Sequence, residues 1–181
     1  MELKKDVFLR GDQVSLRILN EKDIDGNYAG WLNDPEITAY NSHGRFPMTI
    51  DKLKEFVKYA YGSNSSLVFA VIDNNNNEHI GNISLQSISW VDRNAEIAFL
   101  LGEKKYWGKG VMYEAGKLLI DHGFNSLNLH RIHCGTSSEN VGMQRLAEKL
   151  GMIREGARKE AIYKNGQYYD IVEFGIINSK P

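Results

Sequence analysis

The chain has 181 residues, and its 22 Lys and Arg residues nearly balance 23 Asp and Glu residues, so no overall field favours nucleic acid or an anionic membrane. No apolar run is long enough to span a membrane, no secretion signal begins the chain, and a lone cysteine, Cys134, excludes an internal disulfide. We therefore expect one globular domain over residues 1–181, cytoplasmic, with no nucleic-acid or membrane partner.

In the first half of the chain, short strand patterns alternate with amphipathic helix patterns. The expected elements are, in order, a strand at 14–19, a helix from 21 that Pro35 stops, an irregular stretch at 37–48, a helix capped by Thr49 or Asp51, and a hairpin with arms at 67–72 and 79–85. A further strand, which contains Glu96, can pair with the second arm of this hairpin.

The second half continues the same alternation. The expected elements are a helix from Val111, a strand at 131–136, a helix whose apolar face includes Met143 and Ala147 and which Gly151 ends, and a hairpin with arms at 157–163 and 168–176 that turns at Asn165-Gly166. The order predicts an α/β (α+β) protein in which a mixed sheet carries helices on its faces.

A glycine turn between the Glu96 strand and the following helix is the strongest functional signal. Gly108 and Gly110 lack Cβ atoms, so the chain can turn tightly and a ligand can approach the backbone closely. The first N–H groups of the helix from Val111 have no partner within the helix and lie at the positive end of its dipole. The turn therefore predicts a site for a phosphate or pyrophosphate group.

The spacing of the glycines separates the known phosphate loops. A Walker loop would need one residue fewer between Gly102 and Gly108, and Gly110 lies where a Ser or Thr should hold magnesium. A dinucleotide fingerprint would need glycine in place of Tyr113 and would open the first strand–helix unit, whereas this turn comes past the middle of the chain. Neither kinase, GTPase nor dinucleotide binding is supported.

The pattern that fits is Lys105-Tyr-Trp-Gly108-Lys-Gly110, in which a basic or amide residue precedes two spaced glycines. Together with Trp31-Leu-Asn-Asp-Pro35, the segment from Glu139 to Met152 and the tail around Asn165-Gly166 and Asp170, it resembles the GNAT N-acetyltransferase superfamily, RimJ/RimL-type branch, over almost the whole chain. The resemblance implies a GNAT fold with a mixed, largely antiparallel twisted sheet of about seven strands and helices on both faces.

The resemblance also implies acetyl-CoA as co-substrate and assigns its binding residues. The backbone of Phe99, Leu100 and Leu101 would pair with the pantetheine arm at a splay between two strands. The residues that would surround the pyrophosphate are Lys105, Tyr106, Trp107, Gly108, Lys109, Gly110, Val111 and Met112. Asn140 could contact the pantetheine, cap its own helix, or do both.

Glu96 is the leading candidate for the general base. On an alternating strand it shares a face with Ala98 and Leu100, so its carboxylate would lie beside apolar groups near the splay. The competing interpretation is a solvated carboxylate, or one paired with Arg93 or Lys104. A tyrosine acid is common in the helix after the asparagine, but Ala147 occupies that position here, so the general acid is unassigned.

For the amine acceptor, the candidates are Trp31 and Tyr40 in the first helical region and its loop, and Glu160 and Asp170 on the last hairpin. A surface ion pair with Lys159 or Arg158 is an equally good interpretation of the two carboxylates. The acceptor could be a protein N-terminus, an amino sugar or another small amine. The chain could instead be a non-catalytic CoA-binding sensor, no metal site is expected, and a homodimer is consistent with the resemblance.

Overall fold

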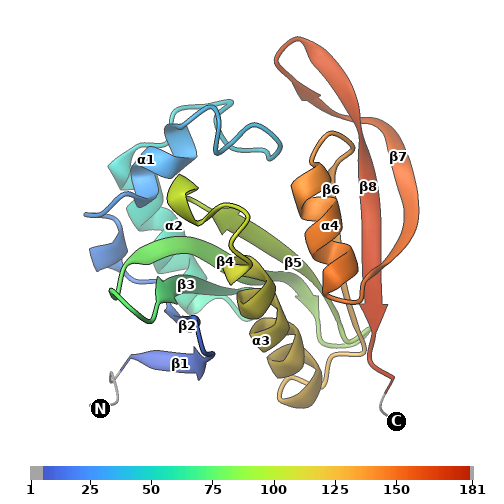
Figure 1. Cartoon of the computed structure of the whole chain (residues 1–181), viewed down its shortest axis with the longest axis horizontal. Helices are drawn as coiled ribbons and strands as arrows, with labels where there is room; N and C mark the ends of the chain where they lie inside the picture. Colours follow the sequence, from blue (N-terminus) through green and yellow to red (C-terminus); the bar gives the residue numbers. More distant parts are fainter. Residues whose placement is uncertain (1–5, 180–181) are drawn as a thin grey trace.

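The computed structural model describes residues 6–179 and contains one eight-stranded sheet in the order β1-β2-β3-β4-β5-β6-β8-β7 (Figure 1). The strands are β1 (Val7–Arg10), β2 (Val14–Ile18), β3 (Leu67–Asp73), β4 (His79–Ser89), β5 (Asn94–Leu101), β6 (Arg131–Ser137), β7 (Ile153–Lys164) and β8 (Gln167–Ile177). All neighbours are antiparallel except β5 and β6. The expected sheet of about seven strands lacked β1, an edge strand of only four residues, which is too short to give a clear periodic signal.

Helices cover both faces of the sheet, as the sequence predicts. They are α1 (Tyr28–Asn33), α2 (Ile50–Gly62), α3 (Val111–Asn125) and α4 (Val141–Lys149), with short 3₁₀ helices η1 (Glu21–Asp23) and η2 (Lys104–Tyr106). One apolar core joins α3 and α4 to the sheet, and a second lies between the sheet and α1 with α2. No helix among residues 6–179 is long and apolar enough to cross a membrane.

The helix expected from residue 21 is broken into η1 and α1. Asn20 caps η1 and the Asp23 side chain returns to the Asn20 N–H, which closes a capping box around a single turn. Asp25, Gly26 and Asn27 follow, and these residue types are poor helix formers. The helix resumes at Tyr28, where its inner face buries Trp31 and Leu32.

The parallel neighbours β5 and β6 diverge along their length, and this positions the functional site. Their register includes only the pairs Asn94–Arg131, Ala95–Ile132 and Glu96–His133. Beyond Glu96, β5 continues to Leu101 against β4 alone, and β6 continues against β8 alone. Beyond Glu96, the facing edges of β5 and β6 therefore carry backbone N–H and C=O groups that do not hydrogen-bond to a neighbouring strand.

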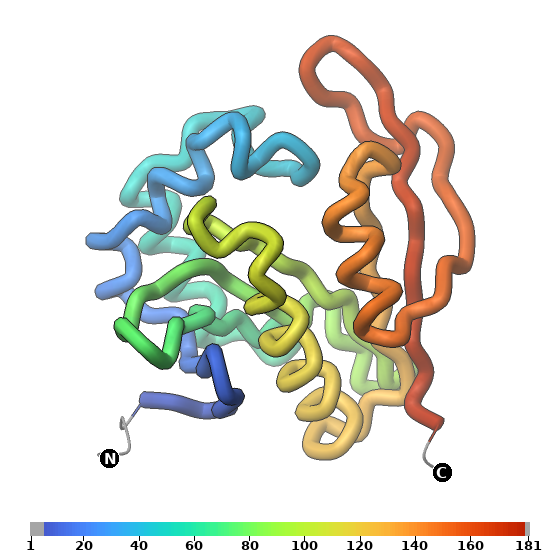
Figure 2. Tube along the Cα trace, viewed as in Figure 1, coloured from blue at the N-terminus to red at the C-terminus, as the bar shows by residue number. Residues whose placement is uncertain are grey.

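The last hairpin extends beyond the end of the other strands. Its turn has Asn165 at φ 51° and Gly166 at φ 81°, the two positive values that a type I′ turn requires. A bulge interrupts β7 at Glu160, which has φ 46°. Figure 2 shows the tip of this hairpin and the α1–α2 loop (residues 37–48) on the same side of the molecule, beyond the diverging ends of β5 and β6.

Candidate active site

The glycine turn (residues 108–112) presents unpaired backbone donors, as expected. Gly108 and Gly110 have φ values of +75° and +80°, and a Cβ built on either would meet nothing within 4 Å. Within residues 6–179, the N–H groups of Gly108, Gly110, Val111 and Met112 have no hydrogen-bond acceptor. Four free donors at the start of α3, with open space in front of them, form a site suited to a diphosphate.

A buried tyrosine holds the turn against the sheet. Tyr106 is 8% exposed, and its hydroxyl donates to Asp73 Oδ2 at 2.5 Å, at the end of β3. The hydrogen bond to Asp73, together with burial, raises the pKa of Tyr106 to about 12. Tyr106 was expected to surround the pyrophosphate, but its side chain is committed to the protein. The Tyr106 side chain therefore anchors the glycine turn to the end of β3.

The two lysines of the turn differ in what they contact. Lys105 Nζ lies 2.6 Å from Glu78 Oε2 on the β3–β4 turn, so its charge is paired within the protein. Lys109 is exposed, with Nζ 5.6 Å from the centre of the Tyr106 ring and no carboxylate partner within residues 6–179. Of the two expected phosphate contacts, only Lys109 keeps an unpaired ammonium group.

Along β5, backbone groups alternate between the sheet and the open edge. A Cβ built on Gly81 of β4 would lie 2.3 Å from the Leu100 carbonyl oxygen, so Leu100 directs its backbone at β4. The groups of Phe99 and Leu101 point the opposite way, towards the divergence from β6. The expected pantetheine contact therefore fits Phe99 and Leu101, whereas the backbone of Leu100 is used within the sheet.

Trp107 connects the turn to this open edge. Its indole Nε1 donates to the Leu101 carbonyl at 3.2 Å, and its side chain is 41% exposed. This contact confirms that the Leu101 carbonyl points away from β4. Trp107 thus makes a continuous surface between the free N–H groups of the turn and the edge of β5.

Glu96 lies at the point where β5 and β6 separate. Its register neighbours are Gln86 on β4 and His133 on β6, which share its face of the sheet. The carboxylate is partly exposed and forms no hydrogen bond or ion pair within residues 6–179. Lys104, one of the two expected partners, pairs with Asp34 and Glu36, and Arg93, the other, contacts Asn128. Within residues 6–179, the Glu96 carboxylate is thus not committed to another protein group.

Three carboxylates of β7 and β8, those of Glu155, Asp170 and Glu173, are paired. Glu173 accepts from Arg158 Nε at 2.6 Å, and Glu155 pairs with Arg131. Asp170 binds Lys159 Nζ at 2.7 Å and also accepts the N–H of Glu160 at 2.9 Å, which supports the bulge. The paired state of Asp170 is the alternative that the sequence left open, and Glu160 contributes its backbone to the same contact.

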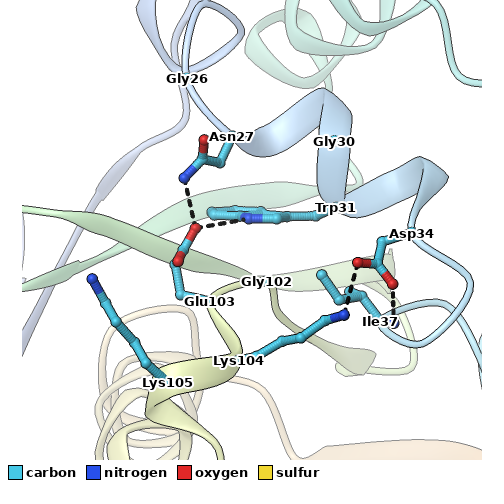
Figure 3. A pocket seen from close by; sticks show the side chains of 10 residues that line it. All are labelled: Gly26, Asn27, Gly30, Trp31, Asp34, Ile37, Gly102, Glu103, Lys104 and Lys105. Atoms are coloured by element: carbon cyan, nitrogen blue, oxygen red, sulfur yellow. Dashed lines mark hydrogen bonds and ion pairs between the residues drawn. The ribbon is translucent and has the colours of Figure 1, made fainter.

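The aromatic acceptor candidates are not brought together. Trp31 is 4% exposed, and a Cβ on Gly102 would lie 1.9 Å from its ring, so glycine is needed there for close packing. Trp31 lines a cavity of roughly 590 Å³ between α1 and residues 102–105, where its Nε1 donates to Glu103 Oε1 at 3.1 Å (Figure 3). Tyr40, 47% exposed in the α1–α2 loop, does not line this cavity.

This geometry agrees with comparison to known proteins. A family model described as an acetyltransferase (GNAT) domain matches residues 13–153. The chain belongs to the GNAT family. As a GNAT protein it is an acetyl-CoA-dependent N-acetyltransferase, and the glycine turn with the open edge of β5 fits that co-substrate.

The proteins that are similar to this GNAT chain carry different names for their acceptors. The uncharacterized N-acetyltransferase p20 of Bacillus licheniformis is 28% identical and is matched over 92% of this chain and 93% of its own length. The spermidine N-acetyltransferase of Vibrio cholerae, solved with CoA and spermine, superposes with TM-score 0.86 at 28% identity over 94% of this chain and 98% of its own. A ribosomal L7/L12 alpha-N-protein acetyltransferase, RimL, solved with coenzyme A, has TM-score 0.85 at 17% identity over 96% and 98%, which shows the fold alone.

In this GNAT structure α4 offers no acid for the departing thiolate. Ala147 is fully buried in the core, and Met143 packs against the same core. Asn140 caps α4, because its Oδ1 accepts the Met143 N–H at 3.1 Å. The helix-capping role of Asn140 is therefore established, and its contact with the pantetheine stays a prediction. The hairpin tyrosines Tyr163 and Tyr168 contact each other, with ring centres 4.8 Å apart.

Buried Cys134 is not placed to act as a nucleophile. Cys134 is 2% exposed beside Met152, and burial raises the pKa of its thiol to about 12, so it is not a reactive thiolate. Among residues 6–179, no group of three His, Cys, Asp or Glu side chains is arranged to hold a metal ion.

No signal in the sequence indicated the roles of Asp73 and Lys164, because their hydrogen-bond partners lie far away in the chain.

Proposed function

We propose that this GNAT protein acetylates a primary amine by direct attack in a ternary complex, with Glu96 as general base. The observation that carries the proposal is the continuity of the site. Free N–H groups at Gly108, Gly110, Val111 and Met112 lead along the open edge of β5 towards Glu96, whose carboxylate is unpaired. The glycine turn would hold the diphosphate and β5 would direct the thioester towards Glu96.

In this proposal, each step of acetyl transfer is assigned to a group of the protein or to water. Acetyl-CoA supplies the acetyl thioester. Glu96 accepts, directly or through a water molecule, the proton that the amine loses as the new C–N bond forms. The N–H of Phe99 or Leu101 donates to the carbonyl oxygen as negative charge develops there. Since α4 presents Ala147 and Met143, water returns a proton to the departing sulfur.

The charges of the β7–β8 hairpin and the α1–α2 loop favour an acceptor that is not a polycation. The carboxylates of Glu155, Glu173 and Asp170 are each neutralised by a basic residue. The α1–α2 loop contains Arg45 and no acidic residue. A polyamine carries several positive charges, which unpaired carboxylates would attract, whereas a protein N-terminus or an amino sugar presents one amine. We therefore propose one of the latter two as acceptor, although a relative is a spermidine acetyltransferase.

An assay of thiol release from acetyl-CoA tests the function and the acceptor together. The panel contains glucosamine, a short peptide with a free N-terminus, and spermidine, each corrected for hydrolysis without amine. Release with glucosamine or the peptide, and little with spermidine, supports the proposal. Preferred turnover of spermidine would overturn the acceptor class while leaving the acetyltransferase reaction intact.

The other hypothesis from the sequence, a CoA-binding sensor without turnover, has in its favour only that Ala147 and Met143 provide no acid, and membership of a family of acetyltransferases argues against it. Calorimetric titration with coenzyme A separates the two candidates when combined with the thiol assay. Tight binding with no thiol release over a broad amine panel would establish the sensor. Membership of the RimJ/RimL-type branch, a cytoplasmic location and a homodimer remain proposals, and light scattering would test the dimer.

A further inference from the structure

Lys164, near the end of β7, has an unusual environment for a lysine at a hairpin tip. Its residue is only 9% exposed, although Tyr163, Asn165 and Gly166 on either side are exposed. Nζ donates to three backbone carbonyls of the α1–α2 loop, those of Thr38, Asn41 (3.0 Å) and His43 (2.9 Å). An ammonium group has three N–H donors, so all of them are used.

Burial of this charge requires an explanation. No carboxylate pairs with Lys164 within residues 6–179, and removing an ammonium group from water is unfavourable without compensation. Burial and the nearby Arg45 charge lower the pKa of Lys164. A side chain at a hairpin tip could remain in solvent, so the burial reflects the folding of the loop around it.

The α1–α2 loop is shaped to present its carbonyls to this one group. The Thr38 hydroxyl donates to the Asp34 carbonyl at 2.8 Å, and the His43 N–H donates to Asn41 Oδ1 at 2.9 Å. Gly44 has φ +75°, and a Cβ there would lie 2.4 Å from Thr38 Oγ1. These contacts curl the loop so that three carbonyls converge on one point.

The contact joins two segments that lie on the same side of the active site. The loop follows α1 and the hairpin follows α4, and both extend beyond the ends where β5 and β6 diverge (Figures 1 and 2). Glu96 lies at the start of that divergence. An amine that reaches Glu96 from this side therefore passes segments whose relative position Lys164 sets.

We propose that Lys164 is a positioning residue that fixes the α1–α2 loop against the β7–β8 hairpin and thereby shapes the amine-acceptor site. The loop contact stands on the structure alone, and its effect on the acceptor rests on the proposed function. Lys164 touches neither reacting group, so its removal acts on acceptor binding through the loop. Coenzyme A binding, which uses the glycine turn, is independent of it.

The test compares Lys164→Met with Lys159→Met. Lys159 lies on the same strand with its side chain 84% exposed, so its substitution controls for loss of a hairpin charge. Hydrogen exchange of residues 37–46 is measured for both variants and the wild type. We expect exchange about tenfold faster in Lys164→Met, since three charge-assisted hydrogen bonds are lost, and little change in Lys159→Met. Coenzyme A affinity equal to wild type shows that the Lys164→Met fold is intact.

Kinetics then tests the acceptor site, with whichever amine of the panel is turned over. We expect the KM for that amine to rise about tenfold in Lys164→Met, with the KM for acetyl-CoA unchanged. Unchanged loop exchange, or an unchanged KM for the amine, overturns the proposal. If no panel amine is acetylated, the proposed function fails, and the exchange result alone still decides whether Lys164 holds the loop.

Discussion

The cofactor side and the acceptor side of this enzyme are built from different kinds of groups. On the α3–α4 side, the proposed cofactor site uses the backbone, through the free N–H groups of Gly108, Gly110, Val111 and Met112 and the open edge of β5. On the α1–α2 side, side chains hold the segments together, through the ion pair of the partly buried Arg17 with the buried Asp23 and through the contacts of Lys164 with the α1–α2 loop. A backbone site depends on fold and glycine, whereas a side-chain site can change with single substitutions.

The largest expected effect is on the backbone site. In Gly108→Val, a β-branched side chain occupies the open space before the free N–H groups and disfavours φ +75°. We expect coenzyme A affinity to fall about 100-fold or more, measured by calorimetry. The control Gly156→Val, also with nothing within 4 Å but without positive φ, should bind as wild type. Equal affinity in Gly108→Val would mean that the turn is not the diphosphate site.

Substitution of the proposed base should separate chemistry from cofactor binding. Glu96→Gln keeps the size of the side chain but removes its ability to accept a proton, so we expect kcat to fall about 100-fold at neutral pH. Coenzyme A affinity should stay the same, and Glu148→Gln, an exposed carboxylate on α4, should have wild-type kcat. Unchanged turnover would exclude Glu96 and leave His133, its neighbour on β6, as the next group to test.

On the α1–α2 side, the pair between the partly buried Arg17 and the buried Asp23 should matter for stability and for the pH dependence of stability. Burial alone would raise the pKa of Asp23, but hydrogen bonds from Arg17 and the Asn20 N–H, with nearby His79, hold it below its ordinary value. A lowered pKa adds stability above the unfolded value of about 3.9, and this stability is lost as pH falls through the folded pKa.

Asp23→Asn leaves the Arg17 charge without its partner, so we expect a loss of about 3 kcal/mol in the free energy of unfolding at pH 7. Urea unfolding should show the gap between variant and wild type narrowing below about pH 4. Asp121→Asn, an exposed carboxylate on α3, serves as the control. A gap that is independent of pH would show that packing, not charge, explains the loss.

Much of the fold follows from local sequence. Thr49 caps α2 as expected, Gly151 ends α4 with φ +83°, and Asn165-Gly166 forms the predicted turn. Features that depend on distant partners could not be predicted. One such feature is Glu114 on α3, whose carboxylate accepts the N–H of Gln13 at 3.0 Å and thereby ties α3 to the β1–β2 turn.

The difference between local signals and distant partners also explains which parts of the candidate site could be predicted. The free donors at Gly108 and Gly110 were predictable because glycine spacing and a helix start are local signals. The role of Lys164 was not, because its three acceptors lie more than 120 positions earlier in the chain. Likewise, the pairing of Lys105 with Glu78 depends on how the β3–β4 turn lies beside η2. Side-chain partners across the sheet have no periodic signature in sequence.

The smallest expected effect tests whether the backbone site needs its anchor. Tyr106→Phe removes the hydroxyl that donates to Asp73, and a hydrogen bond to a charged group contributes about 1.5 kcal/mol or more to stability. We expect the free energy of unfolding, measured by thermal unfolding, to fall by that amount. Coenzyme A affinity should fall only a few-fold, since the Tyr106 N–H still donates to the Glu103 carbonyl. Tyr113→Phe, an exposed tyrosine on α3, is the matched control. A loss of affinity as large as that of Gly108→Val would show that the cofactor side depends on a side chain as strongly as the acceptor side does.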